Sequence, residues 1–298
     1  MSVDVACVGH AFLDITFEGL EALPAPGEER YAEDLHTTPG GAAITAVGLA
    51  RLGLRTALVA PVGTDLAGEL LRRELEAEGI VLAGPTVERT AVTVVLPVGG
   101  ERAFATFERP VSLDPSVVAK LHPRAAIVSI DALGLVPEGT AAYAVLGDEA
   151  ATRLAGRLPE GAGRAAAILT NRSEATRLTG ESSPEGAALA LAEHVATAVV
   201  TCGPDGAVAA SGGELASAGA PRVEARDTTG AGDLFAAAYV WGDLAGLPLA
   251  ERLRRAAVYA ALSVRTVTGA AGASTFDELE RALAELGPVV QEPTAKER

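Results

Sequence analysis

The segment Asp227-Thr228-Thr229-Gly230-Ala231-Gly232-Asp233 is followed by an apolar, alanine-rich stretch that has the length of a helix, Gly232–Trp241. A glycine-rich turn that opens a helix leaves main-chain N–H groups without intrahelical partners, and the helix dipole adds positive potential there. This combination suits a phosphate group. Asp233 would stand beside that phosphate, where it could take a proton from an attacking hydroxyl. The alternative is a carboxylate that only stabilises the helix, by about 0.3–1 kcal/mol.

Around this segment, apolar runs alternate with helical stretches, which predicts a mainly parallel sheet covered by helices on both faces. The expected strands of this core are Val3–Gly9, Thr56–Val62, Ala125–Ile130, Ala142–Leu146, Ala165–Thr170 and Ala196–Thr201. The expected helices are Gly40–Gly53, Asp65–Gly79, Glu149–Arg157, Ser173–Leu178, Pro184–Val195, Gly232–Trp241, Leu249–Val267 and Thr275–Leu286.

Residues Glu88–Arg109 do not follow this alternation of strands and helices. Two β-rich runs, Thr90–Leu96 and Arg102–Phe107, are separated by Pro97–Glu101, whose two glycines suit a hairpin. Together with part of Asp14–Thr38, they predict a small antiparallel sheet that projects from the main body. We therefore assign residues 1–11, 39–86 and 110–290 to an α/β core, residues 12–38 and 87–109 to a β lid, and residues 291–298 to a flexible tail.

The bulk properties exclude several classes of partner. A net charge of −15 argues against a protein that binds nucleic acid or anionic membranes. Cys7 and Cys202 lie within apolar runs, so we expect buried free thiols. We find neither a signal peptide nor a stretch apolar enough to span a bilayer, and we expect a soluble, cytoplasmic protein.

The run from Asp227 to Asp233 resembles the second signature of the ribokinase-like (PfkB) carbohydrate kinases, Asp-Thr-x-Gly-Ala-Gly-Asp. The resemblance implies a three-layer α/β/α sandwich with a small β-sheet lid, ATP as phosphoryl donor and Mg²⁺ as cofactor. It implies that Asp233 is the catalytic base and that Gly230, Ala231 and Gly232 form the anion hole. It also implies a monovalent cation, usually potassium, beside Asp227 and Thr229.

The N-terminal part resembles the family's sugar-binding elements. In Gly9-x4-Asp14 the carboxylate would hold sugar hydroxyls, because a carboxylate can accept from two of them. The stretch that begins Pro39-Gly40-Gly41 resembles the first signature, whose glycines allow main chain to approach a ligand closely. Where the family usually has Asn, this chain is one residue shorter and has Ile44-Thr45, so Thr45 offers a single hydroxyl to the substrate.

Two further segments resemble nucleotide-binding elements of the family. Asn171-Arg172-Ser173-Glu174 matches Asn-x-x-Glu, which implies that Asn171 faces the phosphates and that Glu174 organises Mg²⁺ through water. A purely structural reading makes Ser173 a helix N-cap, and both readings are compatible. Thr201-Cys202-Gly203-Pro204-Asp205-Gly206 resembles the loop beneath ATP. We therefore expect the nucleotide to contact Asn171, Glu174, Thr201, Gly203, Gly206 and Thr229.

The β-rich insertion matches the family's lid, which covers the sugar and often pairs with a second subunit. We therefore expect a homodimer through exposed lid strands. Among Arg89, Arg102 and Arg109, one could meet an anionic group of the substrate, with Arg102 as our candidate, although solvated surface arginines are the favoured interpretation. His10 and His36 are weaker candidates for substrate contact.

The leading hypothesis is an ATP-dependent kinase that phosphorylates a hydroxyl of a sugar or sugar-like small molecule. A nucleoside kinase of the same fold is the runner-up. Kinases of heterocyclic substrates rank lower, because such relatives usually lack a lid. A non-catalytic ligand sensor is the hypothesis from a different class, and retention of Asp233 with the whole anion loop argues against it.

Overall fold

The structure is a computed structural model of the 298-residue chain, and it describes residues 2–98, 101–154 and 156–286. The two glycines of the predicted hairpin and the predicted tail lie outside the described residues.

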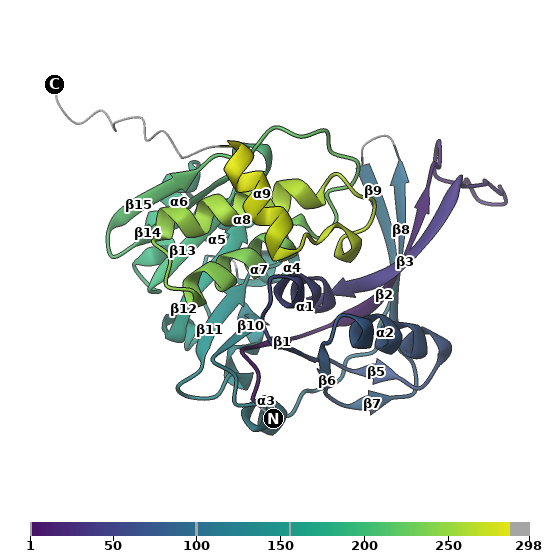
Figure 1. The fold of residues 1–298 in the computed structure, drawn as a ribbon, viewed down its shortest axis with the longest axis horizontal. Coiled ribbons are helices and arrows are strands. Elements are labelled where there is room, and N and C mark those ends of the chain that lie inside the picture. The colour runs from purple at the N-terminus through teal and green to yellow at the C-terminus, as the bar shows by residue number, and fades with distance from the viewer. Residues whose placement is uncertain (1, 99–100, 155, 287–298) are drawn as a thin grey trace.

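A nine-stranded sheet forms the centre of the molecule, with the order β15-β14-β13-β12-β11-β10-β1-β4-β6 (Figure 1). All neighbours from β13 to β6 pair in parallel, whereas β14 and β15 extend the sheet as an antiparallel hairpin. The strands are β1 Val5–Val8, β4 Thr56–Val59, β6 Val81–Ala83, β10 Ala125–Ser129, β11 Ala141–Val145, β12 Ala165–Asn171, β13 Thr197–Thr201, β14 Ala207–Ser211 and β15 Glu214–Ala218.

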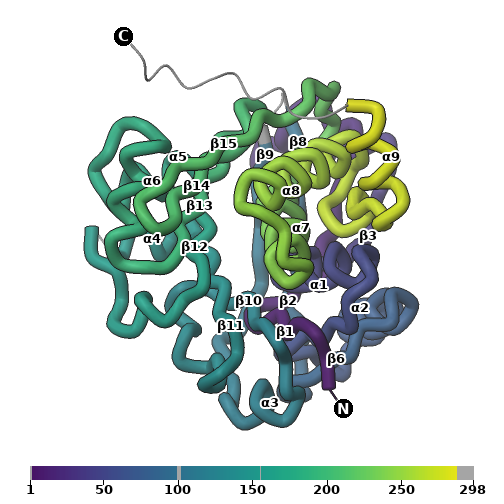
Figure 2. The backbone as a smooth tube through the Cα atoms, turned by 60° about the vertical axis from the view of Figure 1, so that its left-hand side comes forward, coloured from purple at the N-terminus to yellow at the C-terminus, as the bar shows by residue number. Residues whose placement is uncertain are grey.

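Two groups of helices cover the faces of this sheet, on either side of the strands (Figure 2). The alternation of side chains along β1 shows why: Val5 and Cys7 pack with one group, and Ala6 and Val8 pack with the other. The first group is α1 Ala42–Arg51, α2 Leu66–Ala77, α7 Ala231–Leu244, α8 Leu249–Ser263 and α9 Phe276–Leu286. The second is α3 Pro115–Lys120, α4 Asp148–Leu154, α5 Arg172–Thr179 and α6 Pro184–Ala192. The three-layer α/β/α prediction is confirmed.

A separate four-stranded sheet, which we call the lid, rises at one end of the molecule in the order β3-β2-β8-β9 (Figure 1). Its strands are β2 Ala11–Glu18, β3 Asp34–Gly41, β8 Ala91–Val98 and β9 Glu101–Phe107. The expectation of a purely antiparallel sheet was wrong, because β2 and β8 pair in parallel. A two-stranded sheet of β5 Val62–Gly63 and β7 Thr86–Val87 lies between β4 and the lid along the chain. Residues 12–38 and 87–109 stay our interpretation of the lid's extent.

The predicted helix Leu249–Val267 ends earlier, since α8 stops at Ser263. The carbonyl of Val264 accepts hydrogen bonds from the N–H groups of Arg226 and Asp227, at 2.7 and 3.1 Å. The chain therefore leaves the helix to pair with the segment that precedes α7. Apolar residues continue past this point, so periodicity alone could not reveal the helix end.

Both cysteines are buried and unpaired, as predicted. Within the part of the chain that the structure describes, no helix combines the length and the apolar character needed to cross a bilayer.

Candidate active site

The predicted catalytic and nucleotide-binding residues lie where parallel strands end and where α7 begins. Asn171 ends β12 and Thr201 ends β13, and the carboxyl ends of neighbouring parallel strands share one edge of the sheet. Gly230 caps α7 in the left-handed conformation, with φ 75°. A Cβ on Gly230 would lie 3.0 Å from Ile44 Cδ1, so this tight turn has room only for glycine.

The turn before α7 has the features of an anion-binding loop. Among the described residues, the N–H groups of Gly230 and Gly232 have no protein acceptor, whereas the N–H of Ala231 donates to Thr228 O at 3.3 Å. A Cβ on Gly232 would meet no atom within 4 Å, so there is open space in front of it. Some of the main-chain N–H groups that we predicted to bind a phosphate are thus unpaired and accessible.

Asp233 stands in the first turn of α7, and its carboxylate Oδ1 accepts a hydrogen bond from Thr45 Oγ1 of α1 at 3.2 Å. Burial raises the pKa of Asp233 to about 6, and the Thr45 hydroxyl opposes this rise. The group is therefore mostly ionised at neutral pH while remaining able to accept a proton. The contact with Thr45 is a role that sequence reasoning did not assign to that residue.

Asp14 lies on lid strand β2 and is only 8% exposed. Burial raises its pKa to about 7, and the charges of Asp233 and Asp227 add to the rise. A Cβ on Gly40 would lie 2.2 Å from Asp14 Oδ1, so the carboxylate packs directly against this glycine of β3. Gly40 thus makes room for Asp14, in addition to the predicted close approach of main chain to a ligand. Gly41 adopts φ 61° as the N-cap of α1.

Asp227 is buried in the loop before α7 and is held by protein donors on both carboxylate oxygens. Oδ1 accepts from Thr229 N at 2.8 Å and from Thr229 Oγ1 at 2.6 Å, and Oδ2 accepts from Thr268 N at 2.9 Å. Arg102 of lid strand β9 donates from Nη1 to Thr229 Oγ1 at 2.7 Å. Arg102 lies at the surface, as the favoured interpretation predicted, but its guanidinium also contacts this loop.

A cavity of about 540 Å³ opens beside the loop before α7. Three residues of the predicted nucleotide loop, Thr201, Gly203 and Gly206, line it together with Ala231 and Gly232. Its remaining wall is largely apolar and includes Val223, Phe235, Ala257, Ala260, Ala261 and Val264. An apolar slot that ends at an anion-binding loop has the size and character for a nucleotide base and its phosphates.

The wall from α8 was missed at the sequence level. Its alanines read as ordinary helix-packing residues, and no local pattern shows that α8 leaves an open slot beside α7.

Asn171 and Glu174 form a reciprocal cap at the start of α5. Asn171 Oδ1 accepts from Glu174 N at 2.9 Å, and Glu174 Oε2 accepts from Asn171 N and from Thr170 Oγ1, both at 3.0 Å. The N-cap is thus Asn171, and the expectation of Ser173 was wrong. The spacing Asn-x-x-Glu is itself the signature of a capping box and could have revealed this. Burial raises the pKa of Glu174.

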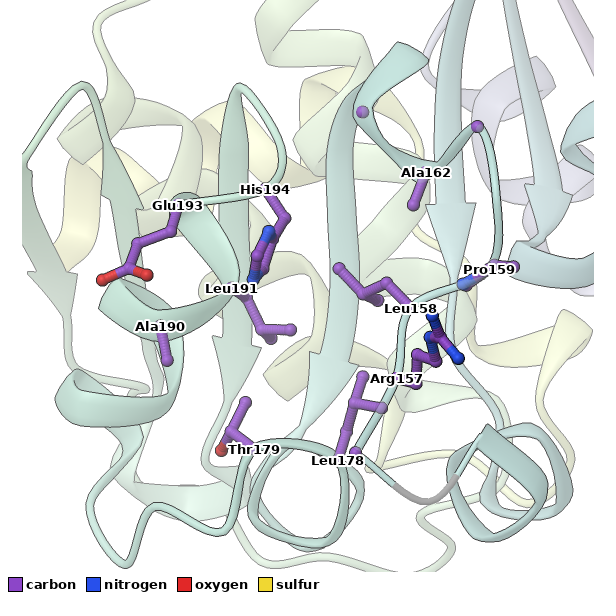
Figure 3. Close-up of a pocket in the computed structure, with 13 residues that line it drawn as sticks. Arg157, Leu158, Pro159, Ala162, Leu178, Thr179, Ala190, Leu191, Glu193 and His194 are labelled. Atoms are coloured by element: carbon purple, nitrogen blue, oxygen red, sulfur yellow. The ribbon is translucent and has the colours of Figure 1, made fainter.

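A second cavity, of about 550 Å³, lies between residues 156–163 and helix α6 (Figure 3). Arg157, Leu158, Leu191 and His194 are among the residues that line it. These segments precede β12 and β13, so the cavity lies at the amino ends of the strands. A strand of seven residues separates it from Asn171 by roughly 20 Å. It is not part of the site described above.

The weaker candidates for substrate contact bind side chains outside this site. His10 Nδ1 contacts Glu108 Oε1, and His36 Nε2 lies 2.8 Å from Glu18 Oε2. The guanidinium groups of Arg89 and Arg109 both lie 5.8 Å from the centre of the Phe107 ring. None of these contacts joins the carboxylates around Asp233.

Comparison with known proteins identifies the family of this chain. The model of the family described as "pfkB family carbohydrate kinase" matches residues 3–275. The fructokinase of Escherichia coli is 28% identical over 289 residues, which cover 86% of this chain and 89% of that protein.

Solved structures show the same fold. A ribokinase of Arabidopsis thaliana complexed with ribose and ATP superimposes with a TM-score of 0.77 at 24% identity, covering 95% of this chain and 99% of that one. A nucleoside kinase of Methanocaldococcus jannaschii also gives a TM-score of 0.77, at 19% identity over 95% of this chain and 98% of that one. Because the family model matches more than half of the residues, the chain belongs to the pfkB family of carbohydrate kinases.

Proposed function

We propose that this kinase transfers the γ-phosphoryl group of ATP to a hydroxyl of a sugar or sugar-like small molecule, with Asp233 as the general base. One observation carries the proposal: Asp233 follows directly on Gly232, which lines a cavity suited to a nucleotide and whose N–H has no acceptor among the described residues. A hydroxyl that attacks the γ-phosphate must approach beside the bound phosphoryl group, so a base at this position can take its proton.

The loop residues Gly230, Ala231 and Gly232 would stabilise negative charge on the phosphoryl group in transit, as preorganised donors do. Asn171 and Glu174 are suited to the hydrated Mg²⁺ that accompanies ATP. Both hydrogen bonds of the Glu174 carboxylate end on Oε2, so its second oxygen can accept from a metal-bound water. When bound, Mg²⁺ would neutralise charge on the β- and γ-phosphates.

Asp14, with Gly40, Gly41 and Thr45, would hold the acceptor. Burial makes ionisation of Asp14 unfavourable without a bound acceptor, and hydroxyl donors from a polyol would stabilise the ionised form. Ile44 packs beside Gly230 where an amide is usual in the family, so one side of the acceptor site is apolar. A nucleoside fits the same lid and the same carboxylate, and it stays the second candidate.

A screen of acceptors tests the proposal. The purified enzyme, with ATP and Mg²⁺, would be offered sugars, sugar acids, sugar phosphates and nucleosides, and ADP release would be measured for each. At least one acceptor should support turnover well above the rate without acceptor. Asp233→Asn should lower kcat about 10²–10⁴-fold, while calorimetry still detects ATP binding. A variant that keeps a tenth of the normal rate excludes Asp233 as the base, and the absence of turnover with every acceptor favours a ligand sensor.

We also propose a homodimer that pairs through the lid. Strand β9 is an edge strand, and Phe107 on it is 42% exposed, while Leu35 on the opposite edge strand β3 is 53% exposed. Light scattering should give twice the mass of the chain, and a monomer at all concentrations would contradict the proposal. The cytoplasm, where ATP is available, is the proposed location. The resemblance also implies a monovalent cation beside Asp227 and Thr229, and the potassium dependence measured in the experiment on Arg102 below decides between that cation and the arginine.

A further inference from the structure

Lid strand β9 sends Arg102 across the site to the loop before α7. Besides its hydrogen bond to Thr229 Oγ1, the guanidinium Nη1 lies 3.7 Å from Asp227 Oδ1, and the arginine side chain is 31% exposed. Because the Thr229 hydroxyl donates its proton to Asp227 Oδ1, it can accept from Arg102. Arg102, Thr229 and Asp227 thus form a continuous polar chain from the lid to the anion-binding loop.

The site has a surplus of negative charge. Burial raises the pKa of Asp14, and the charges of Asp233 and Asp227 raise it further. ATP and the phosphoryl group in transit add further negative charge, so a nearby positive charge is needed. Among the described residues, Arg102 makes the one ion pair of Asp227. The resemblance to the family implies a monovalent cation at this point, whereas this chain places a guanidinium there.

A second contact joins the lid to the same loop. Glu18 at the end of β2 accepts from Arg226 Nη2 at 2.8 Å, and Arg226 directly precedes Asp227. Two different lid strands therefore bind the segment from Arg226 to Thr229, which ends where the anion-binding turn begins. The position of the lid and the position of this loop are physically connected.

We propose that Arg102 is a positioning residue that supplies the positive charge beside Asp227 when the lid closes, in place of a monovalent cation. This inference rests on the proposed function, since it concerns the loop that binds the transferred phosphoryl group. Lid closure and completion of the anion-binding loop then become one event. The loop then keeps its active arrangement while the lid covers the acceptor, which limits transfer of the phosphoryl group to water.

The neighbouring arginines provide a matched control. Arg109 follows β9 in the chain and is 65% exposed, and its partners are the Phe107 ring and the exposed Glu88, 3.7 Å away. Arg109→Met removes the same charge and a similar area of side chain without touching the segment from Arg226 to Thr229.

The experiment compares wild-type enzyme with Arg102→Met, Arg102→Lys and Arg109→Met, using the best acceptor from the screen. Rates are measured in tetramethylammonium buffer, with potassium, sodium or guanidinium chloride added in increasing amounts. We expect the wild-type rate to be independent of potassium. Arg102→Met should lose kcat about 10²-fold, the effect of removing one preorganised donor, with a small change in KM for ATP. Added guanidinium or potassium should restore about tenfold, Arg102→Lys should keep an intermediate rate, and Arg109→Met should match wild type.

Hydrogen exchange of the β9 peptide provides a readout other than activity. With ATP analogue and acceptor bound, β9 should be protected in wild type and Arg109→Met but not in Arg102→Met. Strong potassium activation of the wild type, or an Arg102→Met enzyme with normal kcat and normal protection, overturns the inference. Those outcomes leave the proposed function intact, because it fails only when the wild type transfers phosphate to no acceptor.

Discussion

Replacing Thr45 by valine should shift the pH dependence of phosphoryl transfer without abolishing it. Valine has nearly the shape of threonine, so this buried position on α1 stays filled, but the hydrogen bond to Asp233 Oδ1 disappears. Because the hydroxyl stabilises the ionised carboxylate, its loss raises the pKa of Asp233. The base must be ionised to act, so the acidic limb of the rate profile moves to higher pH.

The size of the shift follows from the geometry. A hydrogen bond to a charged group contributes about 1.5–3 kcal/mol, and the 3.2 Å separation from Thr45 Oγ1 is long for an O–H donor, which favours the lower end. A loss of about 1.5 kcal/mol corresponds to roughly one pKa unit. From a starting value of about 6, the ionised fraction of Asp233 at pH 6 falls from about one half to about one tenth, whereas near pH 8.5 it changes little.

The assay is kcat against pH with saturating ATP and acceptor, for wild type, Thr45→Val and Thr45→Ser. The serine variant keeps a hydroxyl and should follow the wild-type profile. Asp14 titrates in the same range, so the apparent pKa values belong to the coupled pair of carboxylates, and the comparison uses the difference between variants. A Thr45→Val profile that superimposes on wild type, or that falls equally at every pH, refutes the reasoning.

Three further changes have defined outcomes. Gly40→Ala places a methyl group about 2.2 Å from the Asp14 carboxylate. The KM for the acceptor should therefore rise at least about tenfold, while the ATP affinity measured by calorimetry stays unchanged. Equal effects on the acceptor and on ATP would contradict this. Asp14→Asn should raise the Tm of the ligand-free enzyme at pH 8, and the gain should shrink toward pH 5. The pKa of Asp14 is raised from 3.8 to about 7 in the fold, so the native state binds the proton more tightly and loses stability as pH rises through this window, by at most about 4 kcal/mol. A gain independent of pH would exclude that cause. Ala260→Phe fills the apolar cavity and should weaken ATP binding about tenfold or more, with acceptor binding by thermal shift unaffected; unchanged ATP affinity would move the nucleotide elsewhere.

Most of the fold could be predicted because its signals are local. The parallel core follows from apolar runs that alternate with helical stretches, and each predicted core strand appears within a few residues of its expected position. The errors arose where a long-range contact decides the end of a helix or the pairing of strands. Helix α8 ends at Ser263 because Val264 O pairs with the segment before Asp227, and the parallel pairing of β2 with β8 joins residues about eighty positions apart in the chain. The hairpin of β14 and β15 was missed, since its small residues look like loop.

The site shows the same division. The motif from Asp227 to Asp233 predicted the loop and its helix, because a glycine turn and a helix N-terminus are neighbours in sequence. The long-range contacts made with this loop and with Asp233 could not be foreseen. Thr45 and Arg102 reach this loop from α1 and from the lid, across more than a hundred residues, and no local pattern distinguishes Arg102 from Arg109. The residues that carry the chemistry could be identified from the sequence, whereas their long-range hydrogen-bond partners depend on how the lid and the helices pack.

The placement of three carboxylates in one enclosed site has a physical consequence for catalysis. Burial, together with the charges of Asp233 and Asp227, raises the pKa of Asp14, so its ionised form is destabilised when no acceptor is bound. Acceptor hydroxyls would stabilise the ionised form of Asp14, and Arg102 on lid strand β9 lies beside Asp227. Under the proposed role of Arg102, both interactions are present when the acceptor lies beneath the lid, which is when Asp233 must be ionised and water excluded. Burying acid groups in this way opposes stability of the free protein, and such conflict between stability and arrangement is expected where a site serves a reaction.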